Sequence, residues 1–263
     1  MKRFAVAAAT VAAVLVAAGA AFAATTINNY KASYTFSGKK GTASKPAKVS
    51  FNQTINVTPG TPGDRTGILH KITTKIDGVK VQASNASKYT CTAAKINATS
   101  NDNKCPKAAL VATGAIKATL GPPANFSASQ GLACDPELHV WNGGHKKLIF
   151  FFVDTGSHQC LGGQLHTGEV PPWTAKYKQS GKNLDVTIPI PNTVDYPLGT
   201  SGDEVGSLSF EHLHWISKKQ AGKYDIVSTG CKSAKRKYSF SFNASLPGQP
   251  AQTSKTSGSA ACH

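Results

Sequence analysis

The sequence predicts an all-β protein, an antiparallel β-sandwich of the immunoglobulin-like or jelly-roll-like kind that is cross-linked by disulfides. Three observations support this fold class. β-Branched and aromatic residues alternate with polar residues in many short segments, Gly/Pro/Asn-rich turns separate these segments, and the six cysteines form an even set. Helical periodicity is nearly absent from the 263 residues, and the charged fraction of 16% excludes a disordered or coiled-coil chain.

The first expected strands show the alternation most clearly. Residues 49–57 and 68–76 each place apolar side chains on one face, namely Val49, Phe51, Ile55 and Val57 in the first and Ile68, Ile72 and Ile76 in the second. The Pro/Gly-rich stretch 59–64 predicts a turn between them. Further strands are expected at residues 114–120, 138–142, 147–153, 174–178, 183–190, 206–216, 224–228 and 236–243.

One of these strands is apolar without interruption. Residues 148–153 read Leu-Ile-Phe-Phe-Phe-Val, which predicts a strand that is buried on both faces. Lys146, Lys147 and Asp154 flank it, and such charges protect an apolar strand from aggregation.

The rest of the chain is divided as follows. Short helical turns are expected at residues 92–95 and 107–111. Residues 24–48 form a partly extended N-terminal segment, and residues 49–263 form the sandwich domain, with an alternative division into two sub-sandwiches near residue 131. We expect a disulfide of Cys262 to anchor the Ser/Gly-rich C-terminal tail to the domain.

Residues 1–23 have the features of a cleaved signal peptide. Lys2 and Arg3 precede an apolar run, and Ala21-Phe22-Ala23 supplies the small-x-small pattern that predicts cleavage after Ala23. The run is short for a membrane anchor, and the C-terminus is polar. We therefore expect a secreted, extracellular protein with no membrane span in its mature form.

The even cysteine count in a secreted chain predicts three disulfides. Fifteen connectivities are possible, so the spacing alone leaves the pairing open. We favour Cys91–Cys105 across a polar loop and Cys231–Cys262 around the last strands, which leaves Cys134–Cys160. No C-x-x-C pair is present, and this argues against a cysteine metal site.

The positive charge is unevenly distributed. Removing Lys2 and Arg3 with the leader lowers the formal net charge from +16 to +14. Residues 24–130 carry +11, residues 131–211 carry −4 and residues 212–263 carry +7. This pattern is compatible with solubility and internal charge complementarity, or with a basic face that binds an anionic polymer.

Nucleic acid is a disfavoured partner. Arg65 and Arg236 are the only arginines outside the leader, and lysine lacks the bidentate geometry with which arginine reads phosphate and guanine. No zinc-finger, RNP or basic-helix motif is present. An anionic cell-wall polymer or polysaccharide remains the expected class of partner.

The candidate metal ligands are His212 and His214, which share one face of an expected strand. The sequence there is similar to the H-x-H-W strand of the α-type carbonic anhydrases, but residues 235–237 stand where the third histidine of that family would be expected. Ordinary surface histidines are therefore the favoured interpretation. His139, His145, His158 and His166 could join the pair only through the tertiary fold.

Trp141, Trp173 and Trp215 are candidate stacking residues for a sugar ligand, although tryptophans in a sandwich more often belong to the core. No catalytic set and no cofactor motif is present, so no cofactor is expected.

Four short motifs stand out: a C-x-x-A segment at Cys91, a C-P-x-A segment at Cys105, an Asn-Gly-Gly turn at residues 142–144 before the apolar strand, and Ser-Thr-Gly-Cys at residues 228–231. In these motifs the chain resembles a group of uncharacterised secreted, disulfide-containing, β-rich proteins of high-GC Gram-positive bacteria. The resemblance covers roughly residues 68–262 and supports the 91–105 and 231–262 pairings, but it implies no activity.

These observations favour a secreted, non-enzymatic β-sandwich protein that associates with a cell wall or polysaccharide. The alternative is a secreted hydrolase or zinc-dependent enzyme that uses His212 and His214.

Overall fold

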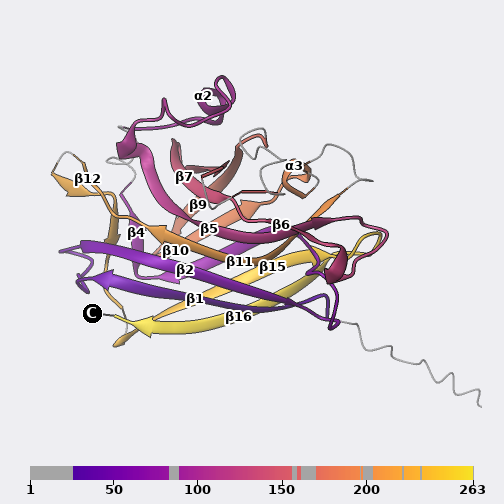
Figure 1. Cartoon of the computed structure of the whole chain (residues 1–263). Helices are drawn as coiled ribbons and strands as arrows, with labels where there is room; N and C mark the ends of the chain where they lie inside the picture. Colours follow the sequence, from indigo (N-terminus) through magenta and orange to yellow (C-terminus); the bar gives the residue numbers. More distant parts are fainter. Residues whose placement is uncertain are drawn as a thin grey trace, which may run out of the picture.

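The computed structural model describes residues 26–82, 89–155, 159–160, 170–195, 197, 204–220, 222–231 and 233–262. The predicted leader and its cleavage site lie outside these residues. The described chain is all-β, and its main element is a 14-stranded antiparallel sheet (Figure 1). The strand order is β16-β15-β3-β10-β9-β8-β7-β5-β11-β2-β14-β4, with β1 paired to β2 and β6 paired to β5.

The strands have the following bounds: β1 Asn28–Gly38, β2 Ala47–Pro59, β3 Ile68–Asp77, β4 Val79–Val81, β5 Leu110–Gly121, β6 Leu132–Cys134, β7 Glu137–Gly144, β8 Lys147–Val153, β9 Trp173–Ser180, β10 Asn183–Pro189, β11 Val205–Trp215, β14 Ile226–Ser228, β15 Lys235–Ser245 and β16 Gln252–Ala261. A two-stranded sheet is formed by β12 Lys219–Gln220 and β13 Lys223–Tyr224. The helical turns are α2 Ala93–Asn97, η1 Lys107–Ala109, η2 Ala128–Gln130 and α3 Asn192–Asp195.

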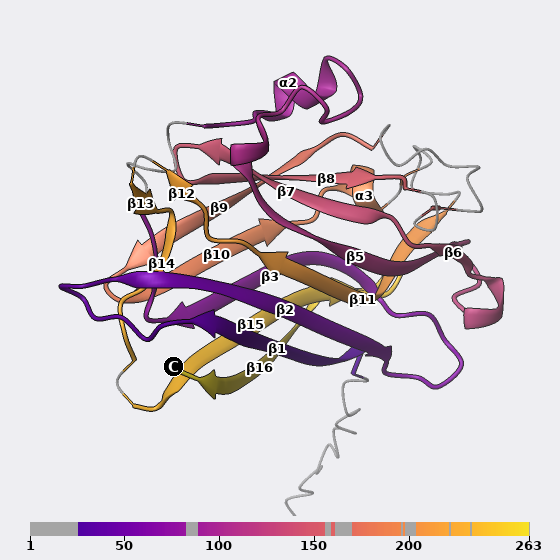
Figure 2. The ribbon, with the colours of Figure 1, turned by 60° about the vertical axis from the view of Figure 1, so that its left-hand side comes forward.

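The large sheet curls until β1 lies beside β16 (Figures 1 and 2). Aromatic rings fill the space between β1 and β15: Tyr30 stacks on Phe242 at 4.0 Å, and Tyr34 stacks on Phe240 at 4.9 Å. The inward faces of the curled sheet therefore meet in one main core. The prediction of an antiparallel all-β fold with disulfides is confirmed, and all the described strands except β12 and β13 belong to one curled sheet.

Two long strands, and the short strands β4, β6 and β12, were not expected from the sequence. Residues 28–38 form β1, which pairs with β2 along its whole length, and residues 252–261 form β16, which pairs with β15 over ten positions. Strands from both sides of residue 131 belong to the same sheet, since β3 lies next to β10 and β5 lies next to β7.

The apolar strand β8 is buried on both faces, as predicted. Leu148 and Phe150 belong to the main core, whereas Ile149 and Phe151 belong to a second core on the outer side of the sheet. Residues 89–109, which carry α2, cover this second core (Figure 2).

All three favoured disulfides are present: Cys91–Cys105, Cys134–Cys160 and Cys231–Cys262. The first lies inside the second core, and the last joins the segment before β15 to the end of β16. No helix in the described part of the chain is long and apolar enough to cross a membrane.

Candidate functional site on the outer face of the sheet

The candidate site is the outer side of six neighbouring strands, β8, β9, β10, β3, β15 and β16. Side chains alternate between the two sides of a strand, so each inward apolar residue places its neighbours outside. In β3, for example, Ile72 and Ile76 are buried, whereas Lys71 and Lys75 are exposed. The register places Lys75 opposite Asp185 on β10 and opposite Ser239 on β15.

Nine exposed lysines gather on this side. We call them, with the residues between them, the lysine face: Lys71, Lys75, Lys147, Lys176, Lys178, Lys182, Lys235, Lys237 and Lys255. Two carboxylates, Asp77 and Asp185, lie on the paired strands β3 and β10 in the same region. Nine lysines and two carboxylates leave a formal surplus of seven positive charges. Such a surplus makes the electrostatic potential over this surface positive.

The lysines of this face form no ion pair with the carboxylates that the structure describes. The ion pairs found among the described residues all involve histidine, so none of the nine ammonium groups is paired with a carboxylate. Lys147 and Lys176 even stand directly opposite each other on β8 and β9. Like charges in that position destabilise a sheet, and an anion bound between them would relieve the repulsion.

Two shallow grooves follow the lysine face. One has a volume of about 650 Å³ and is lined by Lys75, Lys182, Lys235 and Lys237, together with Ser233 and Ser239. The other has a volume of about 750 Å³ and shares Lys75, but extends to Lys255 and to the hydroxyl groups of β15 and β16. The grooves thus combine ammonium groups with hydroxyl donors on a continuous surface.

The opposite outer side, over β1, β2, β11 and β5, carries mainly Asn, Ser and Thr. His212 and His214 lie here on β11, on one face as predicted. His212 Nδ1 is 3.4 Å from Thr54 Oγ1, and His214 Nδ1 is 2.7 Å from Asn52 Oδ1. Within the described residues, no group of three His, Cys, Asp or Glu side chains could hold a metal ion. His158 and His166 lie outside those residues.

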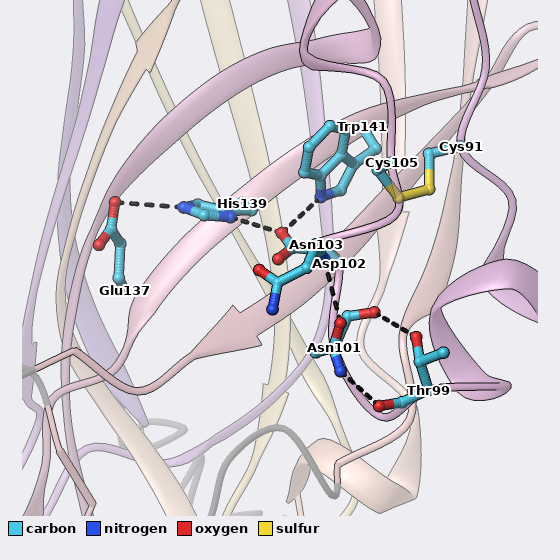
Figure 3. A network of polar contacts seen from close by, with 9 residues as sticks. All are labelled: Cys91, Thr99, Asn101, Asp102, Asn103, Cys105, Glu137, His139 and Trp141. Atoms are coloured by element: carbon cyan, nitrogen blue, oxygen red, sulfur yellow. Dashed lines mark hydrogen bonds and ion pairs between the residues drawn. A yellow bond between two sulfur atoms is a disulfide. The ribbon is translucent and has the colours of Figure 1, made fainter.

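Trp141 is buried in the second core instead of on a sugar-binding surface (Figure 3). Its Nε1 donates to Asp102 Oδ2 at 3.1 Å, and the same oxygen is 2.6 Å from His139 Nδ1. His139 Nε2 is 3.3 Å from Glu137 Oε1. Burial alone would lower the pKa of His139, but the hydrogen bond and charge of Asp102, with those of Glu137, raise it above its usual value.

Trp173 and Trp215 lie in the main core, where they stack on Phe150 at 5.4 Å and on Phe51 at 5.7 Å. The idea of one exposed stacking platform is therefore wrong for the three tryptophans together. The reason is strand periodicity: Trp173 and Trp215 occupy inward positions of β9 and β11, and Trp141 lies on the outer side of β7 beneath residues 89–109.

The lysine face was missed by counting charge along the chain. Its lysines come from all three charge segments, including the acidic one, which contributes Lys147, Lys176, Lys178 and Lys182. The available signal was the i, i+2 and i, i+4 spacing of lysines within expected strands, such as Lys71 with Lys75 and Lys176 with Lys178.

Comparison with known proteins returned no match: no protein-family model, no curated protein and no solved structure is significantly similar to this chain.

Proposed function

We propose that this is a secreted, non-enzymatic protein that binds an anionic polymer of the cell wall, or an anionic polysaccharide, through the lysine face. The observation that carries the proposal is the set of nine exposed lysines without an internal ion-pair partner among the described residues.

Lysine suits this task. Its ammonium group is a mobile point charge with three donors, so it can follow a polymer whose anionic groups are not rigidly placed. Lysines two residues apart on one strand are roughly 7 Å apart, and neighbouring strands are about 5 Å apart. The face therefore offers a dense two-dimensional array of charges, and the Ser and Thr hydroxyls between them can bind neutral oxygens of the same polymer.

The predicted leader and the three disulfides support an extracellular location, because disulfides persist in oxidising compartments. The resemblance to secreted proteins of high-GC Gram-positive bacteria points the same way and to a cell-wall polymer as the available polyanion.

The test is co-sedimentation of the purified protein with isolated Gram-positive cell walls over a series of NaCl concentrations. Binding should be strong at low salt and should fall steeply as salt screens the ammonium groups. A face variant would replace four lysines by glutamine: Lys75, Lys176, Lys237 and Lys255. A matched variant would replace four exposed lysines elsewhere: Lys31, Lys104, Lys117 and Lys219.

Both variants lose the same net charge, so they separate the position of the charge from its amount. We expect the face variant to lose most of its binding and the matched variant to retain most of it. Equal losses of binding in the two variants would refute the proposed function. So would an unmodified protein that stays in the supernatant at low salt.

A further inference from the structure

A second set of polar groups lies inside the curled sheet, on the other side of its strands from the lysine face. A cavity of about 100 Å³ is lined mainly by apolar side chains, and Phe150, Phe152 and Trp173 form its aromatic wall. A single water needs only about 10–15 Å³ of such space, so the cavity is large enough for a ligand of several heavy atoms.

Two carboxyl groups line this apolar cavity. Glu211 is 4% exposed, and its Oε1 accepts a hydrogen bond from Gln53 Nε2 at 2.5 Å. Asp195 is 3% exposed and lies at the end of α3, where Gly206 of β11 packs against it. Burying an ionised carboxylate is costly unless a positive charge or several donors accompany it.

The described lining of the cavity supplies no such charge. It contains no lysine or arginine. His70 Nδ1 is 3.3 Å from Asp195 Oδ2, but burial lowers the pKa of His70 and so disfavours the charged form of this ring. Burial raises the pKa of Glu211 to about 7, against the opposing effect of the Gln53 hydrogen bond, and that of Asp195 to about 8, because desolvation penalises the ionised form.

Two further polar atoms in the cavity wall lack partners. Ser207 Oγ and Trp173 Nε1 have no hydrogen-bond partner in the described structure. Water cannot easily replace the missing partner, because Ser207 is only 1% and Trp173 only 8% exposed. An unsatisfied buried polar group destabilises the protein. A bound donor group could satisfy Ser207 Oγ, which can accept a hydrogen bond, while the apolar part of the ligand contacts the aromatic wall; Trp173 Nε1 is itself a donor and would gain no partner from an ammonium group.

We propose that this cavity binds a small alkyl amine in its ammonium form. On binding, the ammonium group pairs with a buried carboxyl group in its ionised form, the carboxyl proton passes to the solvent, and the alkyl group fills the space against Phe150, Phe152 and Trp173. An ammonium ion next to aromatic rings is also favoured by its attraction to their π faces. The inference is independent of the lysine face, which lies on the outer side of the sheet.

The test compares three molecules with the same branched body: isobutylamine, isobutanol and isobutyrate. Each is titrated into the isotopically labelled protein at pH 7, and binding is followed through the NMR shifts of residues around the cavity. Because a charge-assisted hydrogen bond is worth about 1.5–3 kcal/mol, we expect the amine to bind at least about tenfold more tightly than the alcohol. The anionic isobutyrate should not bind.

The carboxyl groups are tested with the double variant Asp195→Asn, Glu211→Gln, which should lose the preference for the amine over the alcohol. Asp185→Asn on the lysine face is the matched control and should keep it. A second variant, Ala118→Leu, fills the cavity and leaves both carboxyl groups in place, so it should abolish binding of amine and alcohol alike.

Three results would overturn the proposal. The first is equal affinity of the unmodified protein for the amine and the alcohol. The second is no binding of the amine at all, which would mean that the cavity holds water only. The third is binding of the amine that persists in Ala118→Leu. If the double variant does not fold, the order of the three molecules and the Ala118→Leu result decide the question.

Discussion

The contact of Asp102 with His139 and Trp141 should hold residues 89–109 on the sheet, and the substitution Asp102→Asn tests this. The carboxylate accepts from two donors at 2.6 and 3.1 Å, and the side chains of His139 and Asp102 are only 18% and 9% exposed. Both donors contact the same carboxylate oxygen, so asparagine can still place one acceptor oxygen between them, but it removes the negative charge that strengthens both hydrogen bonds. The expected loss is about 2–3 kcal/mol, the size of one charge-assisted hydrogen bond.

The loss should depend on pH in a defined direction. The pKa of folded His139 is raised, so its protonation stabilises the fold fully below the unfolded value of about 6.5 and ceases to do so as the pH rises through the higher folded value. The difference between the unmodified protein and Asp102→Asn should therefore be largest near pH 6 and smaller near pH 9.

The assay is thermal and urea unfolding of both proteins at these two pH values. For a chain of this size, 2–3 kcal/mol corresponds to a fall in Tm of about 4–12 °C. Asp185→Asn, which removes an outer carboxylate without an ion pair among the described residues, is the control and should have little effect. A cost below about 0.5 kcal/mol, or an equal cost at both pH values, would refute the reasoning.

Three further predictions concern other parts of the molecule. Replacing the Cys231–Cys262 pair by alanines should cost about 3–4 kcal/mol in the chain-entropy model and should lower hydrogen-exchange protection first in β16; unchanged protection there would contradict the role given to this disulfide. Glu211→Gln should raise Tm at pH 8 but not at pH 4, because the raised pKa of the folded carboxyl destabilises the protein only above its unfolded value; a loss of stability at pH 8 would show that the carboxylate is favourably held. Dialysed protein should contain no stoichiometric zinc by atomic absorption, and zinc that disappears in the His212→Ala, His214→Ala variant would instead support the enzyme hypothesis.

Much of the fold could be predicted because local pattern and burial agree. In β8, six consecutive apolar residues predicted burial on both faces of the strand. The structure has the main core on one face and the second core on the other. The strand β1 also carried a signal that was overlooked, since Tyr30, Ala32, Tyr34 and Phe36 alternate with polar residues.

The strand β16 could not be predicted in this way, because its Ser/Gly-rich sequence has no apolar face of its own. It is a strand because β15 offers a partner edge, and because Gly258 leaves room for the ring of Tyr238. A Cβ atom at Gly258 would lie 2.5 Å from the Tyr238 hydroxyl oxygen. The lysine face escaped prediction for a related reason: it depends on which strands are neighbours, and register between distant strands is not encoded in local spacing.

The contact between β1 and β16 also constrains the order in which the parts of the sheet can fold. These strands stand at opposite ends of the chain, with residues 39–251 between them, so the first strand synthesised finds its last neighbour only when residues 252–261 have left the ribosome. Contacts of such long range slow folding, because the loop between them must be closed first. The curled sheet can therefore close at the seam between β1 and β16 only as a late step of folding.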